Sequence, residues 1–585
     1  MRILIGQGSC GIASGAKKTA DAFAHQLQVI GKNQVVVDKT GCIGICYLEP
    51  IVDVYEDDGK LTRYTKVTED KVPRIIEEHI IGGVPVEEFI ISDSGQEFLE
   101  KQTRIALKNC GLIDPENIDD YINVGGYEAL KKALTQMSPE QICDEISESK
   151  LRGRGGGGFP TGRKWQQVRQ QKEPVKYVVC NGDEGDPGAF MDRSIMEGDP
   201  HRMLEGMIIA GIATGSQTGY IYVRAEYPMA VHRLKVAIEQ ARERGFLGEN
   251  ILGSGVNFDI RINLGAGAFV CGEGSALTAS IEGNRGMPRV KPPRTVEKGL
   301  FEKPTVLNNV ETFANVPEII LYGATKFAQV GTEKSSGTKA FALTGNVNNT
   351  GLIEVPMGTT LRQVVMDIGG GVKNGKAFKA VQIGGPSGGC LTSRHLDLPL
   401  DFDSLKSVGA MIGSGGLVVM DEDTCMVSIA RFFMNFTNNE SCGKCVPCRE
   451  GTHVMLEILD DIVEGRGTEE SLDMLMDLAS TISETALCGL GKTAPSPVMS
   501  TLSEFKDEYL AHVIDKRCPA KQCPGLARLV IDPVRCKGCG KCIRFCPVNA
   551  IRGSLKNPHY IDEDKCIKCK VCMESCAFDA IEYVQ

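Results

Sequence analysis

The chain has 585 residues, a formal net charge of −10 and 23 cysteines. This length predicts about four domains, and the lack of a long basic tract or of about 18 consecutive apolar residues argues against a nucleic-acid partner and a membrane span. The N-terminus lacks a signal-peptide pattern and the cysteines stand in short-spaced groups, so we expect a metal-binding protein of the reducing cytoplasm.

Residues 1–92 show a strand–helix–strand pattern that predicts a small α/β domain. Cys10 follows the first predicted strand, and Cys42 and Cys46 flank the loop after the second. Thiolates on loops at strand ends are typical ligands of a two-iron cluster. We therefore predict a [2Fe–2S] site, with three buried structural cysteines as the alternative.

This segment resembles the thioredoxin-like [2Fe–2S] domain that accompanies pyridine-nucleotide-oxidising flavoproteins. The family pattern is C-x4-C followed by C-x3-C. GCIGIC over 41–46 supplies the second pair, but Gly15 stands where the first pair needs its second cysteine. The resemblance therefore implies a cluster that lacks one thiolate. An oxygen of Ser9 or Ser14 is the expected fourth ligand, unless the cluster has been lost.

A glycine-rich stretch over 151–165, LRGRGGGGFPTGRKW, stands out within residues 93–335. Consecutive glycines let backbone N–H groups approach a ligand closely, and the flanking arginines and Lys164 supply fixed positive charge. We expect this stretch to bind phosphate, with Phe159 and Trp165 offering flat surfaces to a ring system.

The same stretch contains G-x-G-x-x-G, formed by Gly153, Gly155 and Gly158. A dinucleotide-binding fingerprint needs a hydrophobic strand before it. The preceding segment is instead an amphipathic helix pattern with Ser138 as its N-cap. We therefore reject the ordinary Rossmann fingerprint, and a glycine-rich surface loop is the alternative.

Three later stretches carry polar side chains at predicted strand ends or helix starts. Residues 177–190 form a strand that runs into an acidic loop, and 262–277 repeat a strand followed by a glycine turn. Carboxylates at the ends of parallel strands suit ribose hydroxyls or the polar edge of a flavin. Residues 303–317 bring two asparagines to a helix start. The candidates are Asn181, Asp183, Glu184, Asp186, Glu273, Asn308, Asn309 and Thr312.

Together these stretches closely resemble the NADH-oxidising flavoprotein subunit of respiratory complex I and its soluble relatives, over residues 120–515. The resemblance implies a Rossmann-like domain for FMN and NAD over 93–335. It implies Glu184, near flavin and nicotinamide, and Lys164 as catalytic residues. The implied FMN contacts are Gly153, Gly155, Lys164, Asn181, Asp183, Asn308, Asn309 and Thr312, with Tyr227 near the isoalloxazine, and Phe159 and Lys291 line the nucleotide pocket.

Two positions depart from the NADH enzymes of that family. Gly274 stands where their CGEET pattern has a glutamate facing the adenosine ribose, and Arg294 replaces an aromatic residue of their KPPF stretch. Losing an anion and gaining a guanidinium both favour a 2′-phosphate. NADP(H) therefore remains open beside NAD(H), with Asp186, Glu273, Gly274 and Arg294 as further cofactor-binding candidates.

Residues 336–425 alternate short apolar runs with glycine and asparagine turns. This pattern resembles the soluble-ligand-binding β-grasp domain that follows the flavin domain in the same family. We expect a spacer or docking surface here rather than a ligand site.

Residues 426–525 predict a helical domain that opens with SCGKCVPCREG. Three thiolates at C-x2-C-x2-C spacing reach three corners of a cubane, and a remote cysteine closes it. Zinc is the rival, but zinc usually takes cysteines in pairs. We predict a [4Fe–4S] cluster on Cys442, Cys445, Cys448 and Cys488, which in the family accepts electrons directly from FMN.

The end of this helical segment carries a second metal candidate. His512, Cys518 and Cys523 lie within HVIDKRCPAKQC, and Cys425 is a candidate fourth ligand. Three borderline-soft ligands at this spacing suit zinc better than an iron–sulfur cluster. A structural zinc would fix the tail to the helical domain, and a linker with free thiols is the alternative.

Residues 526–585 contain two copies of C-x2-C-x2-C-x3-C, which predict a ferredoxin-like domain with two [4Fe–4S] clusters. In such repeats the fourth cysteine of each run binds the other cluster. The predicted ligand sets are Cys536, Cys539, Cys542 and Cys576 for one cluster, and Cys566, Cys569, Cys572 and Cys546 for the other.

The additional tail makes the chain resemble the flavin subunit of soluble, electron-bifurcating, NAD(P)-dependent [FeFe]-hydrogenases. That resemblance implies an α/β multidomain oxidoreductase subunit that exchanges electrons between NAD(P)(H), ferredoxin and a partner hydrogenase. A small [2Fe–2S] subunit is a further implied partner in a hetero-oligomer. The alternatives are the diaphorase subunit of a formate dehydrogenase and a non-catalytic iron–sulfur scaffold.

Overall fold

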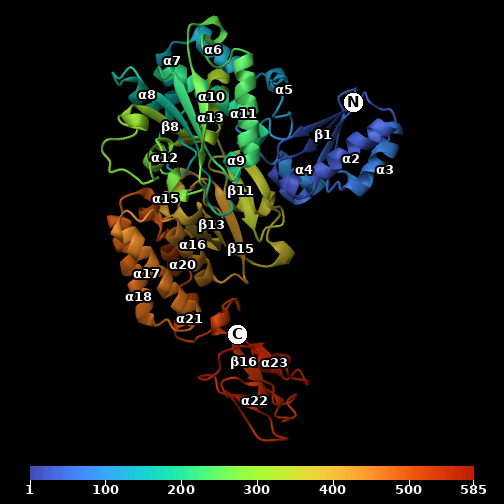
Figure 1. The fold of residues 1–585 in the computed structure, drawn as a ribbon, viewed down its shortest axis with the longest axis vertical. Helices are drawn as coiled ribbons and strands as arrows, with labels where there is room; N and C mark the ends of the chain where they lie inside the picture. The colour runs from blue at the N-terminus through green and yellow to red at the C-terminus, as the bar shows by residue number, and fades with distance from the viewer. Residues whose placement is uncertain (585) are drawn as a thin grey trace.

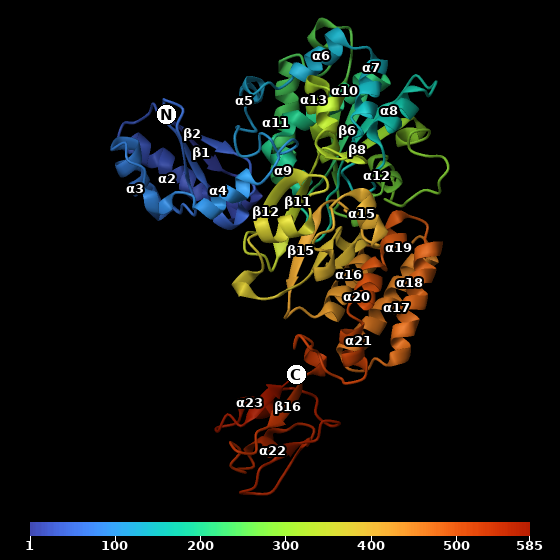
Figure 2. The same ribbon diagram turned by 180° about the vertical axis from the view of Figure 1, so that it is seen from behind.

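The computed structural model describes residues 1–584, arranged as five consecutive units. In Figure 1 a parallel-sheet unit (green) and a mixed-sheet unit (yellow) form the body with a helical unit (orange). The N-terminal unit (blue) lies against one side of this body, and the C-terminal tail (red) extends from the helical unit; Figure 2 shows the same arrangement from behind. None of the helices within residues 1–584 is long and apolar enough to cross a membrane.

The N-terminal unit is a four-stranded sheet in the order β2-β1-β3-β4, with β1 parallel to β2 and antiparallel to β3. Its apolar core packs the sheet against α2, whose Phe23 and Leu27 are buried. The elements are β1 (Arg2–Gly6), α1 (Ser9–Ala13), α2 (Ala16–Val29), β2 (Val36–Thr40), β3 (Val52–Tyr55), β4 (Leu61–Tyr64), α3 (Val72–Arg74) and α4 (Asp93–Glu100).

The parallel-sheet unit has four parallel strands in the order β7-β6-β5-β8: β5 (Tyr177–Gly182), β6 (Thr218–Arg224), β7 (Asp259–Gly265) and β8 (Thr305–Asn309). Helix α10 (Pro200–Thr214) is buried along its whole length, as expected for its apolar sequence. The other helices are α5 (Ile118–Asn123), α6 (Glu128–Gln136), α7 (Pro139–Glu148), α8 (Thr161–Arg169), α9 (Met191–Gly198), α11 (Pro228–Glu243), α12 (Gly274–Ile281), α13 (Val310–Tyr322) and α14 (Ala324–Ala328).

The glycine-rich stretch joins two helices of this unit, the first of which was predicted from the sequence. Ser138 and Gln141 form a capping box at the start of α7, which ends before the glycines. The stretch then doubles back through a bridge between Arg152 and Pro160 and enters α8. It is therefore a helix-to-helix turn rather than a strand-to-helix turn.

The mixed-sheet unit has five strands in the order β12-β11-β15-β13-β14. Strands β11 and β15 are parallel and the remaining pairs are antiparallel. Its elements are β9 (Gly331–Thr332), β10 (Ser335–Ser336), β11 (Thr338–Gly345), β12 (Gly351–Pro356), β13 (Phe378–Ile383), β14 (Gly389–Thr392), α15 (Phe402–Ser407) and β15 (Gly416–Asp421).

The helical unit and the tail complete the chain. The helices are α16 (Met426–Glu440), α17 (Val446–Val463), α18 (Glu469–Thr485), α19 (Gly489–Thr493), α20 (Ser496–Glu504) and α21 (Lys506–Val513). The tail pairs its first and last strands around a small core that includes several cysteines. Its elements are β16 (Arg528–Ile531), α22 (Lys541–Phe545), β17 (Ile551–Arg552), β18 (Tyr560–Ile561), α23 (Val571–Glu574) and β19 (Ile581–Val584).

Candidate functional site

A cavity of about 350 Å³ opens at the carboxyl ends of the parallel strands, where the glycine turn meets the acidic loop. Such strand ends are where open α/β sheets bind ligands. Seven of the sequence-predicted residues line the cavity: Gly155, Asn181, Asp183, Glu184, Asp186, Glu273 and Asn309. The sequence did not single out Asp192, Phe269, Val270 or Gly272, which also line it.

The flanking arginines of the glycine turn do not face this cavity, contrary to our expectation. The guanidinium of Arg154 is buried and donates to the carbonyls of Thr338 and Ser336, while its backbone N–H donates to Thr312 Oγ1 at 2.9 Å. Burial lowers the pKa of Arg154 to about 10. Arg152 donates to Gly158 O at 2.7 Å. These two arginines therefore brace the turn and leave its backbone N–H groups as candidate phosphate donors.

Asn308 and Lys164 do not line the cavity, whereas Asn309 does. Trp165 Nε1 donates to Asn308 Oδ1 at 3.2 Å, and Asn308 Nδ2 has no hydrogen-bond partner in the described part of the chain. Asn309 caps α13 by accepting from Thr312 N at 3.2 Å. Lys164 donates to Leu307 O at 2.5 Å, and burial lowers its pKa to about 8. Gly153 is held by a hydrogen bond from its N–H to Phe159 O.

The acidic loop gives the cavity buried carboxyl groups. Burial raises the pKa of Asp183 to about 7 and that of Asp186 to about 6, and it also raises the pKa of Glu184. Glu184 accepts from the backbone N–H groups of Asp192 and Arg193, each at 3.0 Å. Both carboxyl oxygens of Asp183 lack a hydrogen-bond partner within residues 1–584. Such orphaned groups fit a ligand with N–H and hydroxyl donors, as FMN has.

We expect Asp183→Asn to stabilise the FMN-free protein in a pH-dependent way. An unfolded-state aspartate ionises near 3.8, whereas Asp183 stays protonated up to about 7. Ionisation therefore destabilises the fold progressively as pH rises between these values. The variant should melt at a higher temperature than the wild type at pH 8 and at the same temperature at pH 4. At pH 8 the gain in the free energy of unfolding should be at most about 4 kcal/mol. A melting difference that is the same at both pH values in calorimetry would contradict this assignment.

Residues expected on the nucleotide side are more exposed and do not all line the cavity. Glu273 caps α12 by accepting from Ser275 N at 3.0 Å, and it pairs with Lys291 at 2.5 Å. Gly274 begins α12, and Arg294 is exposed. Phe159 is 39% exposed. Tyr227 lies at the edge of the acidic loop, where its hydroxyl donates to Glu184 O at 2.8 Å.

The mixed-sheet unit closes the other side of the cavity, which corrects our expectation of a spacer. Gly384, Ser387, Met411, Gly413 and Ser414 all line it. Ser414 hydrogen-bonds Asp186, and Gly413 forms a bridge with Gly156 of the glycine turn. The glycines of IGSGG over 412–416 were the available sequence signal.

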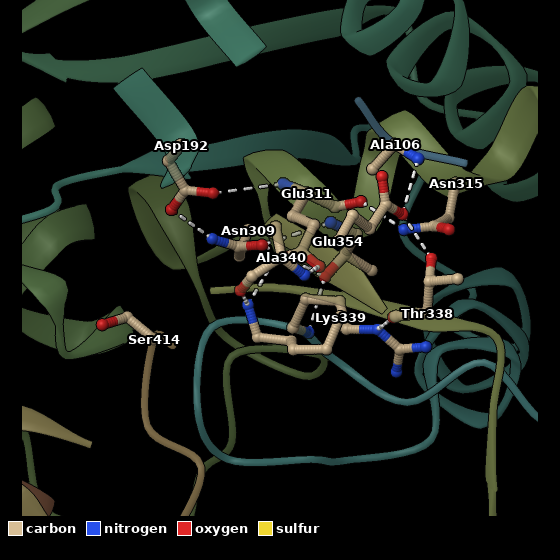
Figure 3. A network of polar contacts seen from close by, with 12 residues as sticks. Ala106, Asp192, Asn309, Glu311, Asn315, Thr338, Lys339, Ala340, Glu354 and Ser414 are labelled. Atoms are coloured by element: carbon tan, nitrogen blue, oxygen red, sulfur yellow. Dashed lines mark hydrogen bonds and ion pairs between the residues drawn. The ribbon is translucent and has the colours of Figure 1, made fainter. Parts of the chain in front are cut away.

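Buried polar contacts join the two units beneath the cavity (Figure 3). Glu311 of α13 pairs with Lys339 at 2.5 Å and accepts from Ala340 N at 2.9 Å. Asp192 accepts from Asn309 Nδ2 and from Glu311 N. Because both charges of the Lys339–Glu311 pair are buried, loss of either would leave an uncompensated charge.

Four cysteines of the helical unit surround a second, smaller cavity: Cys442, Cys445, Cys448 and Cys488. Val270 and Leu490 line both this cavity and the larger one. Two hydrogen bonds join the helical unit to the parallel-sheet unit here, from Phe269 N to Glu440 Oε2 at 2.8 Å and from Lys444 Nζ to Pro288 O at 2.6 Å. Val270 and Leu490 therefore lie between the larger cavity and the four thiols.

The tail groups its eight cysteines into two sets that cross between the repeats. The sets are Cys536, Cys539, Cys542 and Cys576, around one small cavity, and Cys546, Cys566, Cys569 and Cys572, around another. These are the groupings expected from the sequence, in which the last cysteine of each run belongs to the other set.

Cys425, His512, Cys518 and Cys523 converge at the base of α16, with all ligand atoms within 4.8 Å of one another and all four residues buried. Cys425 Sγ lies 3.4 Å from His512 Nε2 and 3.5 Å from Cys523 Sγ. His512 Nδ1 lies 2.7 Å from the carbonyl of Glu508. That contact directs Nε2 toward the thiols, which is the orientation typical of a zinc-binding histidine.

Three cysteines of the N-terminal unit also come together. Cys42 Sγ and Cys46 Sγ are 3.8 Å apart, and hydrogen bonds with both lower the pKa of the Cys10 thiol. Ser9 donates to Glu197 Oε1 at 2.6 Å, whereas Ser14 is exposed at the end of α1. The triad lies at the contact with α9, because a Cβ on Gly41 would clash with Gly198 Cα.

A ligand cavity that shares Val270 and Leu490 with a cavity lined by four cysteines is the arrangement expected where a cofactor site adjoins an iron–sulfur cluster. Sequence profiles match the Nuo51 FMN-binding domain over residues 146–318 and the iron–sulfur binding region of NADH-ubiquinone oxidoreductase-F over 428–512. Further profiles match an SLBB domain over 341–391 and 4Fe–4S binding domains over 529–552 and 559–582.

Similar proteins extend this assignment to most of the chain. The HndC subunit of the NADP-reducing hydrogenase of Solidesulfovibrio fructosivorans is 57% identical over 82% of this chain and 98% of its own length. An F-type subunit of the NADH-quinone oxidoreductase of Rhizobium meliloti (strain 1021) is 44% identical over 71% and 99%. A crystal structure of NAD+-reducing [NiFe]-hydrogenase in the H2-reduced state superposes with a TM-score of 0.64 and 29% identity, covering 88% of this chain and 84% of that one.

The chain therefore belongs to the family of FMN-binding and iron–sulfur oxidoreductase subunits that includes HndC and the F-type subunits of NADH-quinone oxidoreductase. Its architecture is multidomain α/β, with an FMN-binding domain, an SLBB domain and 4Fe–4S and ferredoxin domains.

Proposed function

We propose that this chain takes electrons from NAD(P)H at a bound FMN and delivers them to the cluster on Cys442, Cys445, Cys448 and Cys488. The observation that carries the proposal is the shared wall of Val270 and Leu490 between the two cavities. Bound FMN supplies the ability to accept two electrons from a nicotinamide and to release them singly.

The chain's own residues position the reactants. The glycine turn lines the cavity, and its backbone N–H groups would hold the phosphate. Asp183 and Asn308 carry polar side-chain atoms without hydrogen-bond partners in the described part of the chain, and these would bind the ring or ribityl chain. Glu184 is fixed by two backbone N–H groups beside the cavity, so its carboxylate would orient flavin and nicotinamide rather than move. Lys164, which does not line the cavity, adds positive charge.

For the nucleotide, we propose NADP(H). Glu273 is already engaged with Lys291 and the start of α12, so no free carboxylate at this helix start would repel a 2′-phosphate. Arg294 is exposed nearby in the sequence and would pair with that phosphate. The relative HndC is named as a subunit of an NADP-reducing hydrogenase.

Anaerobic titration with each nucleotide tests both function and cofactor. We expect NADPH to bleach the flavin and cluster absorbance together. The double variant Gly274→Glu/Arg294→Phe should bind NADPH about 10–100-fold more weakly relative to NADH than the wild type does. This factor corresponds to the loss of one charge-assisted contact. Loss of flavin and cluster absorbance with NADH but not with NADPH would contradict the proposal of NADP(H). Bleaching by neither, with FMN bound, would favour an electron-transfer scaffold.

We further propose that the tail exchanges electrons with ferredoxin, and that a hydrogenase subunit with a small [2Fe–2S] subunit completes a bifurcating hetero-oligomer. The two crossed thiol sets of the tail support an additional electron terminal. A formate dehydrogenase as the partner is the second candidate. Co-purification that recovers a molybdenum-containing subunit instead of a hydrogenase would select it.

The proposal also includes a zinc ion and a [2Fe–2S] cluster. The set of Cys425, His512, Cys518 and Cys523 fits a structural zinc, because it offers four converging soft ligands with an oriented histidine. The triad of Cys10, Cys42 and Cys46 fits three of the four ligands of a [2Fe–2S] cluster.

A further inference from the structure

A buried carboxylate without a complete set of partners lies beside the N-terminal thiol triad. Glu49 follows the short turn Cys46–Leu48 and is only 7% exposed. Its Oε2 accepts from Ile51 N at 3.0 Å, but Oε1 has no hydrogen-bond partner among the residues that the structure describes. Burying a carboxylate oxygen without a partner costs several kcal/mol unless a hydrogen bond, a cation or a metal compensates it.

The backbone around Glu49 places its carboxylate against helix α1, which carries Cys10. A Cβ on Gly11, the residue after Cys10, would lie 3.1 Å from Glu49 Oε2. A Cβ on Gly8 would lie 3.1 Å from Cys42 Cβ. Helix α1 therefore packs closely against both the Cys42 loop and the Glu49 side chain.

The two serine oxygens expected as fourth ligands are less suited. Ser9 already donates to Glu197, and its backbone N–H donates to the same carboxylate at 2.9 Å. Ser14 is exposed, so water satisfies its hydroxyl at no cost. Both groups must lose a proton to bind iron strongly, but a carboxyl group loses its proton far more readily than a serine hydroxyl does.

We propose that Glu49 is the fourth protein ligand of the N-terminal [2Fe–2S] cluster, which completes a set of three thiolates and one carboxylate. The proposal rests on the cluster put forward under the proposed function. One carboxylate carries the same charge as the missing thiolate, so the total ligand charge is unchanged. An oxygen on one iron makes the two irons inequivalent.

The test uses the full chain with all its clusters reconstituted. Electron paramagnetic resonance of the reduced protein is recorded at a temperature where [4Fe–4S] signals broaden and the [2Fe–2S] signal persists. We expect Glu49→Gln to shift the g values of that signal or abolish it. Ser14→Ala and Ser9→Ala are the matched controls and should leave it unchanged. An unchanged signal in Glu49→Gln, or its loss in Ser14→Ala alone, would overturn the proposal.

A second measurement does not depend on a folded variant. Wild-type protein is prepared with glutamate labelled with ¹³C at the side-chain carboxyl carbon, Cδ. It should show a resolved ¹³C hyperfine coupling on the [2Fe–2S] signal. A signal without that coupling would reject Glu49 as the ligand but keep the cluster. If the wild type gives no [2Fe–2S] signal at all, both the cluster and its ligand are rejected. Flavin bleaching by nucleotide reports the proposed function separately, because the cavity lies in another unit.

Discussion

Gly156→Val is expected to leave the purified protein almost free of FMN. Gly156 has φ of +107°, which side chains rarely adopt, and a Cβ there would lie 3.1 Å from two backbone atoms of Gly413. The strain at such a φ costs about 1–3 kcal/mol, and a β-branched side chain adds to it. The turn would have to move away from the mixed-sheet unit, which removes both the N–H groups and one wall of the cavity.

Flavin fluorescence after denaturation and filtration measures the retained FMN. We expect affinity to fall by about 100-fold, the equivalent of about 3 kcal/mol. Gly59→Val is the matched control, because Gly59 also has a positive φ, of +87°, but stands in open space far from the cavity in the chain. If Gly156→Val kept a full complement of FMN, the assignment of the cavity to the flavin would be wrong.

Replacing both Cys518→Ser and Cys523→Ser should remove one zinc ion from each chain. The two thiols are half of the converging ligand set, and structural zinc sites contribute apparent free energies of about 10–16 kcal/mol. The linker after α21 would lose its anchor to Cys425 at the start of α16. Proteases should then cut between the helical unit and the tail far faster than in the wild type.

Zinc is measured by elemental analysis beside iron, and cleavage by limited proteolysis. Cys143→Ser is the control, because Cys143 is also buried but lies in α7, where its thiol donates to Ala213 O. This variant should keep its zinc and its resistance to proteases. An unchanged zinc content in the double variant would rule the site out.

The grouping of the tail cysteines was predictable because its signal is local spacing. Cys536 and Cys576 lie in different repeats, yet the rule that each run donates its last cysteine to the other cluster placed them in one set. The helix before the glycine turn was predictable for a similar reason, since Ser138 stood as a recognisable N-cap ahead of an amphipathic pattern.

The remaining parts of the site depend on how distant segments pack. Ser414 approaches Asp186 only because β15 begins beside the acidic loop, and no periodicity in residues 336–425 signals that contact. Likewise, Arg152 and Arg154 read as phosphate ligands in the sequence, but the carbonyls that receive Arg154 belong to β10 and β11, in the mixed-sheet unit. Nothing in the local sequence around Glu49 signals that its side chain is buried.

The flavin cavity lies between two units, with the glycine turn on one and Gly413 and Ser414 on the other. A ligand that touches both walls contributes its binding free energy to their association, and their association in turn strengthens the ligand's binding. Flavin release and separation of the two units are therefore reciprocal events. Bound FMN would therefore stabilise the contact between the two units in addition to carrying electrons.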